Sequence, residues 1–300
     1  MKLTITNLSK TYSNGVRALH DVSLTIPQGM FGLLGPNGAG KSSLMRTIAT
    51  LQEADHGQIV LEETPAGTID VLRQKHDVRK LLGYLPQEFG VYPKVTAETM
   101  LDHIASLKGI ANRAERKTVV EALLEKVNLA HVRKKNLGTF SGGMKQRFGI
   151  AQALIGNPSL IIVDEPTAGL DPAERNRFHN LLSEIGENTI VILSTHIVED
   201  VTNLCSAMAI INLGEVIAEG HPAGLVADIQ GKIWRKTIEK VELDAFRNDY
   251  QVISTQLKAG KTQIHIYSET QPLDFEPVEA DLEDVYFSKI TATKKTAVVA

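Results

Sequence analysis

The sequence has almost no cysteine, no long hydrophobic run and no excess of basic charge, and each absence excludes a class of protein. Cys205 is the single cysteine, so the chain cannot form an internal disulfide, and we expect this thiol to be a small buried hydrophobe. No segment reaches the roughly 18 apolar residues that a membrane-spanning helix needs, and the chain starts without the apolar stretch of a secretory signal. We therefore expect any role at a membrane to depend on a partner.

The composition is that of an ordinary folded protein. Hydrophobic residues make up 43% of the chain and charged residues 22%, and the formal net charge is −3. A chain of 300 residues is long enough to bury most of its unfolded surface. Because there is no strong positive field, we expect no nucleic-acid partner.

The first part of the chain predicts a small sheet followed by a strand, a glycine loop and a helix. Lys2–Thr6 and Val22–Ile26 alternate in polarity and predict antiparallel strands. Met30–Leu34 is a short apolar run that ends in glycine. Ser42–Leu51 then has apolar residues at helical spacing.

The middle of the chain predicts an inserted helical region and then a parallel sheet. Helical spacing extends from about residue 94 to 155. The two apolar runs Leu160–Val163 and Thr189–Leu193 flank an amphipathic segment, Pro172–Ile185. Such continuous apolar strands are typical of a parallel sheet that helices cover on both faces.

Beyond Gly220 the pattern changes, which predicts one domain over residues 1–220 and an accessory region over 221–300. Ile233–Val241 and Tyr250–Tyr267 predict strands, the latter folded into a hairpin at residues 259–261. We expect a short helix near Asp281–Phe287 and a frayed tail over Thr291–Ala300.

A complete phosphate-binding loop follows the strand that ends at Leu34. Its backbone amides can surround phosphates, Lys41 can reach the β- and γ-phosphates, and the Ser42 hydroxyl can bind Mg²⁺. The candidate cofactor-binding residues of this loop are Gly35, Pro36, Asn37, Gly38, Ala39, Gly40, Lys41, Ser42 and Ser43. The loop predicts a nucleoside triphosphate as ligand.

Two carboxylates, Asp164 and Glu165, directly follow the apolar run Leu160–Val163. They lie at the C-terminal end of a predicted strand, where open α/β sheets bind their ligands. Asp164 is placed to hold magnesium, and Glu165 is a candidate base for the attack of water on the γ-phosphate. The alternative is a pair of carboxylates that cap a helix or face solvent. The preceding phosphate loop favours the metal and the base.

Two further residues are candidates for catalysis. His196 ends the next apolar strand, which we expect to lie beside the strand of Asp164, so its imidazole can reach the γ-phosphate. Gln87 can orient the attacking water or bind Mg²⁺, and the alternative is an exposed loop amide.

The segment Ser141-Gly142-Gly143 opens a second predicted helix and has the form of an anion-binding helix start. Taken alone, the serine can equally be a simple N-cap. If the segment does bind an anion, the chain carries two sites for phosphate, of which only the first has a lysine.

The ordered set of motifs resembles the ATP-binding cassette (ABC) ATPases of membrane transporters. The resemblance covers about residues 3–220 and rests on Gly35 to Ser42, Gln87, Ser141-Gly142-Gly143, Leu160 to Glu165, Gly169-Leu170-Asp171-Pro172 and His196. It implies an α/β fold: a P-loop NTPase core of RecA-like type with an N-terminal antiparallel β subdomain, the helical insertion and an α+β C-terminal extension.

The resemblance also implies how the site is assembled. Two cassettes, either two copies or a copy and a relative, would face each other head to tail around two ATP molecules and Mg²⁺. Ser141, Gly142 and Gly143 of one would cap the γ-phosphate held by the other, and Asp171 would couple the two sites. Tyr12 would stack on adenine, although a tyrosine that packs on the core is the alternative.

The end of the chain and the surface near Gln87 indicate which kind of transporter the chain would serve. Leu282–Phe287 is similar to the ending of cassettes that serve exporters of drugs, lipids or polysaccharides. A permease in the membrane would then receive the surface near Gln87 and residues 89–92, and the chain would lie peripherally on the cytoplasmic face. Met144 departs from the usual glutamine of the motif after Ser141. Alternatives are a cassette ATPase that acts on nucleic acid or the ribosome, and a nucleotide sensor without turnover.

Overall fold

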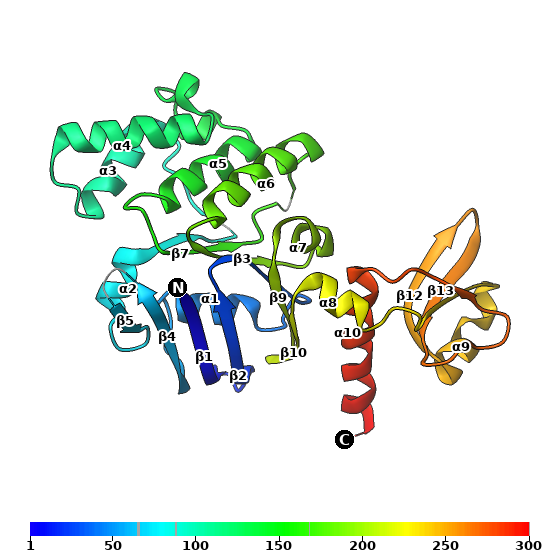
Figure 1. Ribbon diagram of the computed structural model, residues 1–300. Coiled ribbons are helices and arrows are strands. Elements are labelled where there is room, and N and C mark those ends of the chain that lie inside the picture. The colour runs from blue at the N-terminus through cyan, green and yellow to red at the C-terminus, as the bar shows by residue number, and fades with distance from the viewer. Residues whose placement is uncertain (65–66, 88, 168, 300) are drawn as a thin grey trace. The chain divides into compact units, whose positions relative to one another are not determined.

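The computed structural model describes residues 1–64, 67–87, 89–167 and 169–299, with side chains up to residue 292. The chain divides into two compact units, Met1–Val216 and Ile217–Ala300, which we describe separately. Figure 1 labels the elements of both units.

The first unit is built around two sheets. The N-terminal sheet has the order β2-β1-β4-β5, with β1 at Lys2–Thr11, β2 at Arg17–Pro27, β4 at His56–Thr64 and β5 at Gly67–Asp70. β1 pairs antiparallel with both β2 and β4, which confirms the predicted antiparallel strands.

The second sheet has the order β10-β9-β3-β8-β7-β6. Its strands are β3 (Gly29–Leu34), β6 (Leu82–Leu85), β7 (Leu160–Asp164), β8 (Ile190–Thr195), β9 (Ala207–Asn212) and β10 (Glu215–Gly220). Strands β9, β3, β8, β7 and β6 pair in parallel. Their carboxyl ends therefore lie along one edge, and β8 lies beside β7 as predicted for the strand of His196.

Seven α-helices occur in the described part of the first unit. They are α1 (Lys41–Ile48), α2 (Lys75–Leu81), α3 (Ala97–Leu107), α4 (Arg113–Lys126), α5 (Gly142–Ala153), α6 (Pro172–Gly186) and α7 (Val198–Leu204), with short 3-10 turns at Ala130–Val132 and Leu137–Thr139. Helices α3 to α5 form the predicted helical insertion. Figure 1 shows α3, α4, α5 and α6 grouped together, away from β1 and β2.

One hydrophobic core joins the two sheets of this unit through α1. Leu3 and Ile5 of β1, Leu44 of α1, and Ile162 and Ile192 of the parallel strands belong to the same buried cluster. The continuous apolar runs of β7 and β8 are buried along their whole length, as expected for central parallel strands. This core fixes the start of α1, and with it the phosphate loop, against the parallel sheet.

The second unit is α+β, and the predicted hairpin is present. It contains α8 (Pro222–Ala227), β11 (Ile233–Ile238), a 3-10 turn (Lys240–Glu242), α9 (Leu243–Asp249), β12 (Gln251–Lys258), β13 (Lys261–Tyr267), β14 (Glu276–Pro277) and α10 (Leu282–Val299). Its sheet has the order β12-β13-β11-β14. Trp234, Ile264 and Phe275 form its buried cluster.

The prediction of a frayed tail was wrong for the described part of that segment. Helix α10 runs from Leu282 to Val299, well beyond the short helix predicted near Asp281–Phe287, whereas Ala300 lies outside the described residues. The sequence has no glycine or proline after Pro277, so nothing in it stops the helix once begun.

The cysteine and the apolar character of the helices both bear on what the sequence led us to expect. Cys205 is buried, as predicted, and burial raises the pKa of its thiol to about 12. Within the described part of the chain, no helix combines the length and the apolar character that crossing a membrane requires.

Gly83 offers a direct test of how the strand before Gln87 packs. A Cβ atom at Gly83 in β6 would collide with the backbone carbonyl oxygen of Ala153 at the end of α5. Gly83→Ala should therefore destabilise the fold by about 1–3 kcal/mol through overpacking, measured as a lower midpoint of urea unfolding.

Gly224→Ala is the matched control, because a Cβ there meets no atom within 4 Å and the residue lies in α8. Its unfolding midpoint should stay the same or rise slightly. Equal midpoints for Gly83→Ala and the wild-type chain would contradict the close approach of β6 to α5.

Candidate nucleotide-binding site

The phosphate loop connects the end of β3 to the start of α1. Gly38 and Gly40 adopt φ angles of 80° and 108°, a left-handed conformation that glycine adopts without strain. A Cβ at Gly40 would lie 2.5 Å from the carbonyl oxygen of Ala18, and one at Gly35 would collide with the carbonyl of Ile211. The loop is thus tightly packed from behind. The first amides of α1, which lack intrahelical acceptors, lie at its end.

Lys41 is almost fully buried at the first position of α1. Its Nζ donates to the carbonyl oxygens of Gly35 at 2.6 Å and Pro36 at 3.1 Å, and lies 3.8 Å from Glu165 Oε1. Burial lowers the pKa of Lys41, while the carboxylates of Glu165 and Asp164 act in the opposite direction. The ammonium group is held ready for an anion that can replace the carbonyl groups.

The parallel sheet brings four candidate residues together. Lys41 follows β3, His196 follows β8, Glu165 follows β7 and Gln87 follows β6, and these strands are consecutive in the sheet. Because parallel strands end at the same edge, residues far apart in the sequence meet there.

The Glu165 carboxylate is the meeting point of these side chains. Gln87 Nε2 donates to Glu165 Oε2 at 3.1 Å, and His196 Nδ1 lies 3.2 Å from Glu165 Oε1. The Glu165 backbone has φ 46°, a conformation uncommon for a residue other than glycine, and its N–H donates to the carbonyl of Ser194 at 2.8 Å. The strained backbone aims this carboxylate at its three partners.

Asp164 lies next to this group and is suited to bind a cation. The residue is 5% exposed, and its Oδ1 has no hydrogen-bond partner among the described residues. Burial raises the pKa of Asp164 and the charge of Glu165 adds to the rise, whereas the Ser194 and Ser42 hydroxyls and the charge of Lys41 partly offset it. An orphaned carboxylate oxygen beside a serine hydroxyl fits the oxygen ligands that Mg²⁺ prefers.

A cavity of about 410 Å³ opens in front of the loop, and its lining residues include Tyr12, Lys41, Ser42, Gln87 and Glu165. Its volume is within the range of small-molecule sites. The Tyr12 ring is half-buried at this cavity, and its hydroxyl bonds to Ser43 Oγ and Gln52 Oε1, both at 3.0 Å. Stacking on adenine and packing on the core thus both remain compatible with its position.

Sequence reasoning missed residues that support this cavity. Gln52 holds Tyr12 and also donates to the carbonyl of Ser43 at 2.8 Å and to Thr47 Oγ1 at 2.9 Å. Arg17 lines the cavity from β2. Neither residue is part of a motif, and no local pattern could have identified them.

The second phosphate motif lies outside the cavity lining. Ser141 is the N-cap of α5, its Oγ accepts from the Met144 N–H at 3.2 Å, and it is exposed. Asp171 is the N-cap of α6 and accepts from the Glu174 N–H at 2.9 Å. Ser141 is thus an N-cap, as in the alternative that the sequence left open, and its hydroxyl still has capacity for another hydrogen bond.

The starts of α5 and α6 lie side by side. A Cβ at Gly143 would lie 2.6 Å from Glu174 Oε2, and the same carboxylate oxygen is 3.3 Å from Arg147 Nε of α5. Glu174 therefore joins the helix that begins after Ser141 to the helix that begins after Asp171. The two exposed caps therefore begin helices that are in direct contact.

The loop, buried lysine, paired carboxylates and strand-end histidine define a P-loop nucleotide-hydrolysing protein. The sequence model of the ABC transporter family matches residues 19–168, which is about half of the chain. The chain belongs to the ABC transporter family as an ATP-binding and ATP-hydrolysing subunit.

The chain is similar in sequence to curated relatives over most of their length. The ABC transporter ATP-binding protein NatA of Bacillus subtilis (strain 168) is 37% identical, over 73% of this chain and 89% of the relative. The linearmycin resistance ATP-binding protein LnrL of the same organism is 35% identical, over 86% of this chain and 85% of the relative.

Solved structures share the fold of the first unit. The dimeric post-hydrolysis state of the ATP-binding cassette MJ0796, bound to ADP and phosphate, is 26% identical, with a TM-score of 0.65 over 73% of this chain and 98% of the other. The likeness confirms the predicted cassette fold and its nucleotide ligand.

Substitutions at Tyr12 can decide between the two interpretations of its ring. If the ring stacks on adenine, Tyr12→Ala should weaken ATP binding by about 1–3 kcal/mol, the usual loss when an aromatic platform for a base is removed. Tyr12→Phe, the control, keeps the ring and should bind ATP almost normally. Titration with a fluorescent ATP analogue measures both, and normal affinity for Tyr12→Ala would support the packing alternative.

Proposed function

We propose that two copies of this chain, or one copy and a related cassette, close around two molecules of ATP and drive a separate permease in the membrane. The observation that supports this best is the division of the phosphate-binding residues. Lys41 and Glu165 meet at one cavity, whereas Ser141 and Asp171 are exposed caps outside its lining. A second copy brings the two halves together.

Each side chain at the sheet edge has a role in this proposal. Lys41 leaves the carbonyl oxygens of Gly35 and Pro36 and binds the β- and γ-phosphates. Glu165 orients a water and accepts its proton as the oxygen attacks the γ-phosphorus and the bond to the β-phosphate oxygen breaks. Gln87 and His196, already on the Glu165 carboxylate, position that water and the γ-phosphate.

Magnesium fits the same edge. Ser42, Gln87 and Asp164 would hold it, since Asp164 Oδ1 is buried with no partner in the described structure. When bound, the ion neutralises charge on the phosphate oxygens. Asp164 supplies the fixed negative charge that retains a cation here.

The other half of each site would come from the opposite chain. Ser141 and the amides of Gly142 and Gly143 cap the γ-phosphate, because the start of α5 directs unpaired N–H groups outward. Asp171 at the neighbouring start of α6 reaches the same interface. This second site needs no lysine of its own.

A chain of contacts connects the γ-phosphate position to the helical insertion. Gln87 bonds to Glu165, and two residues later Phe89 packs against α5, where a Cβ at Gly149 would lie 2.8 Å from its ring. A change at Glu165 on ATP binding can therefore shift α5 and Ser141. ATP can drive a permease only if it binds the closed state of the dimer more tightly than the open state. These contacts would link that difference in affinity to the position of α5.

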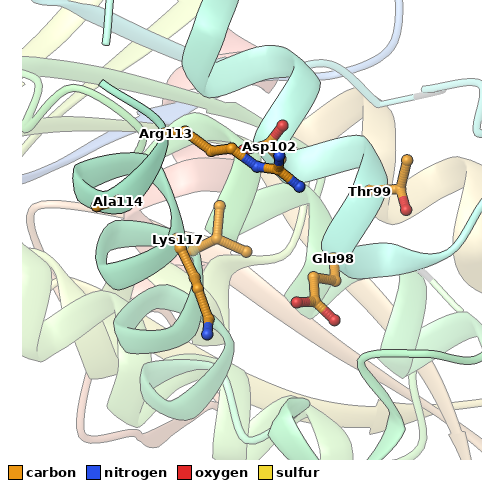
Figure 2. A pocket seen from close by; sticks show the side chains of 7 residues that line it. Glu98, Thr99, Asp102, Arg113, Ala114 and Lys117 are labelled. Carbon is orange, nitrogen blue, oxygen red and sulfur yellow. The ribbon is translucent and has the colours of Figure 1, made fainter. Parts of the chain in front are cut away.

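The permease would dock beside this connection, and the coupling would pass through residues 89–92. Tyr92 is 65% exposed there, next to the half-buried Phe89 and Val91. A hollow of about 580 Å³ opens between α3 and α4, and Figure 2 shows Glu98 and Asp102 of α3 opposite Arg113 and Lys117 of α4. The hollow has charges of both signs beside the apolar side chain of Val120, which suits a polar loop of a membrane protein.

Export is the direction we propose for the transport. LnrL and the doxorubicin resistance protein DrrA of Mycobacterium tuberculosis (strain CDC 1551 / Oshkosh), 35% identical, are named for drug resistance. The lipopolysaccharide export protein LptB of Haemophilus influenzae (strain ATCC 51907 / DSM 11121 / KW20 / Rd), 33% identical, is named for export. The chain would then lie on the cytoplasmic face of the membrane, bound through its permease.

Glu165→Gln tests the proposed dimer. The substitution should keep ATP binding but lower turnover by roughly 10²- to 10⁴-fold, because it removes the general base. ATP should then trap a closed dimer, measured by light scattering after gel filtration. Adding Ser141→Arg should abolish that dimer, since the bulky cation blocks the facing phosphate site. A monomer under saturating ATP would sink the proposal.

Isolation with a mild detergent from the native source tests the partner. A multi-span membrane protein should accompany the chain, and Tyr92→Ala combined with Glu98→Lys should reduce its recovery. Leu273→Ala, at a residue that is 85% exposed in the second unit, is the control and should leave recovery unchanged. Ribosomes or DNA in place of a membrane protein would favour the non-transport alternative.

A further inference from the structure

Asp200 is a fully buried carboxylate that the proposed mechanism does not use. It lies in α7, four residues after His196, and is 0% exposed. A buried carboxylate is strongly unfavourable unless charges and hydrogen bonds satisfy it. Its presence therefore requires an explanation in terms of what surrounds it.

Five hydrogen-bond contacts satisfy this carboxylate. Oδ1 accepts from Arg175 Nε at 2.9 Å, from Arg175 Nη2 at 2.6 Å and from His179 Nε2 at 2.9 Å. Oδ2 accepts from Thr167 Oγ1 at 2.6 Å and lies 3.4 Å from Thr195 Oγ1. Since a carboxylate offers about four acceptor positions, both oxygens are saturated.

The donors come from the segments that carry the proposed catalytic residues. Thr167 follows Glu165 by two residues, and Arg175 and His179 belong to α6, which begins next to Asp171. Thr195 ends β8 directly before His196, and its Oγ1 also accepts from the Ile197 N–H at 2.9 Å. The Asp200 carboxylate thus binds Thr167 before Asp171 and Arg175 after it, and it also contacts Thr195 at the strand end before His196.

A buried ionic cluster of this kind is weak evidence for stability, because apolar residues of similar volume often serve as well. Its distinctive property is geometry: Arg175 directs Nε and Nη2 at Oδ1 alone, so that Oδ2 is left to the threonine hydroxyls. The short hydrogen bond from Thr167 Oγ1, at 2.6 Å, then fixes Thr167 against Asp200, and Thr195 Oγ1 makes a longer contact of 3.4 Å with the same oxygen.

We propose that Asp200 is a positioning residue for ATP hydrolysis, which fixes the Asp171 loop and the His196 strand end relative to each other. This inference rests on the proposed roles of Asp171 and His196. It adds that the two segments are set by one shared partner and do not move independently.

Thr167→Val is the sharpest test, because it removes the hydroxyl donor to Asp200 while keeping the side-chain volume. Its kcat for ATP should fall roughly tenfold, the effect of losing a hydrogen bond to a charged group that holds reacting parts in place. Affinity for a fluorescent ATP analogue should stay within about twofold, since Lys41 and its loop are untouched. Thr167→Ser restores the hydroxyl and should recover most of the rate.

Two further variants complete the test. Asp200→Asn should lower kcat at least as much as Thr167→Val, and the double variant should be no slower than the slower single variant, because both break the same link. Glu199→Gln is the control: Glu199 pairs with Arg175 at 2.9 Å, but its side chain is 68% exposed. Its kcat should be that of the wild-type chain.

The outcomes separate this inference from the proposed function. Normal kcat for Thr167→Val, equal losses for Thr167→Val and Thr167→Ser, an effect on KM alone, or a loss that matches the unfolded fraction in thermal melts would each overturn it. If Asp200→Asn fails to fold, the threonine pair still decides. Full turnover by Glu165→Gln would instead overturn the proposed function, whatever the threonine variants show.

Discussion

Three buried charges at the edge of one parallel sheet set the requirements for the rest of the site. The Lys41 ammonium and the carboxylates of Asp164 and Glu165 are each less than a tenth exposed, and they follow strands separated only by β8. Buried charges need partners, and here they partly serve one another. Asp164 Oδ1 lacks a partner in the described chain, and the Lys41 ammonium group donates to backbone carbonyl oxygens, so both groups suit the phosphate and the cation that we propose.

In the dimer we propose, a second copy supplies the remaining phosphate ligands. A site that closes around ATP within one chain would be a static pocket, whereas a site divided between two surfaces couples ATP to their approach. Glu174 and Asp200 keep the two exposed surfaces in register: the first ties α5 to α6, and the second ties α6 to the ends of β7 and β8. ATP binding can then move these elements as a unit.

The sequence predicted which residues meet at the edge of the parallel sheet because its signals there are local. The Gly35–Ser42 loop is recognisable by itself, and the apolar runs before Asp164 and His196 are typical of central parallel strands. Contacts that depend on distant segments had no such signal. Gln52 and Arg17 reach the cavity only once the chain has folded, and the positive φ of Glu165 occurs beside a backbone contact with Ser194 of β8. In the sequence, Asp200 has the same pattern as a solvated acid on a short helix. The length of α10 was missed because a polar sequence without glycine or proline can continue a helix or fray.

In our proposal the two halves of the ATP site belong to different copies of the chain. A structure of the Glu165→Gln chain with ATP and Mg²⁺ bound would test this assignment. We expect the γ-phosphate to contact Lys41 of one copy and to lie within hydrogen-bonding distance of Ser141 of a second copy, with Mg²⁺ on Ser42 and Asp164. ATP bound at Lys41 while Ser141 of every copy faces solvent would contradict the account.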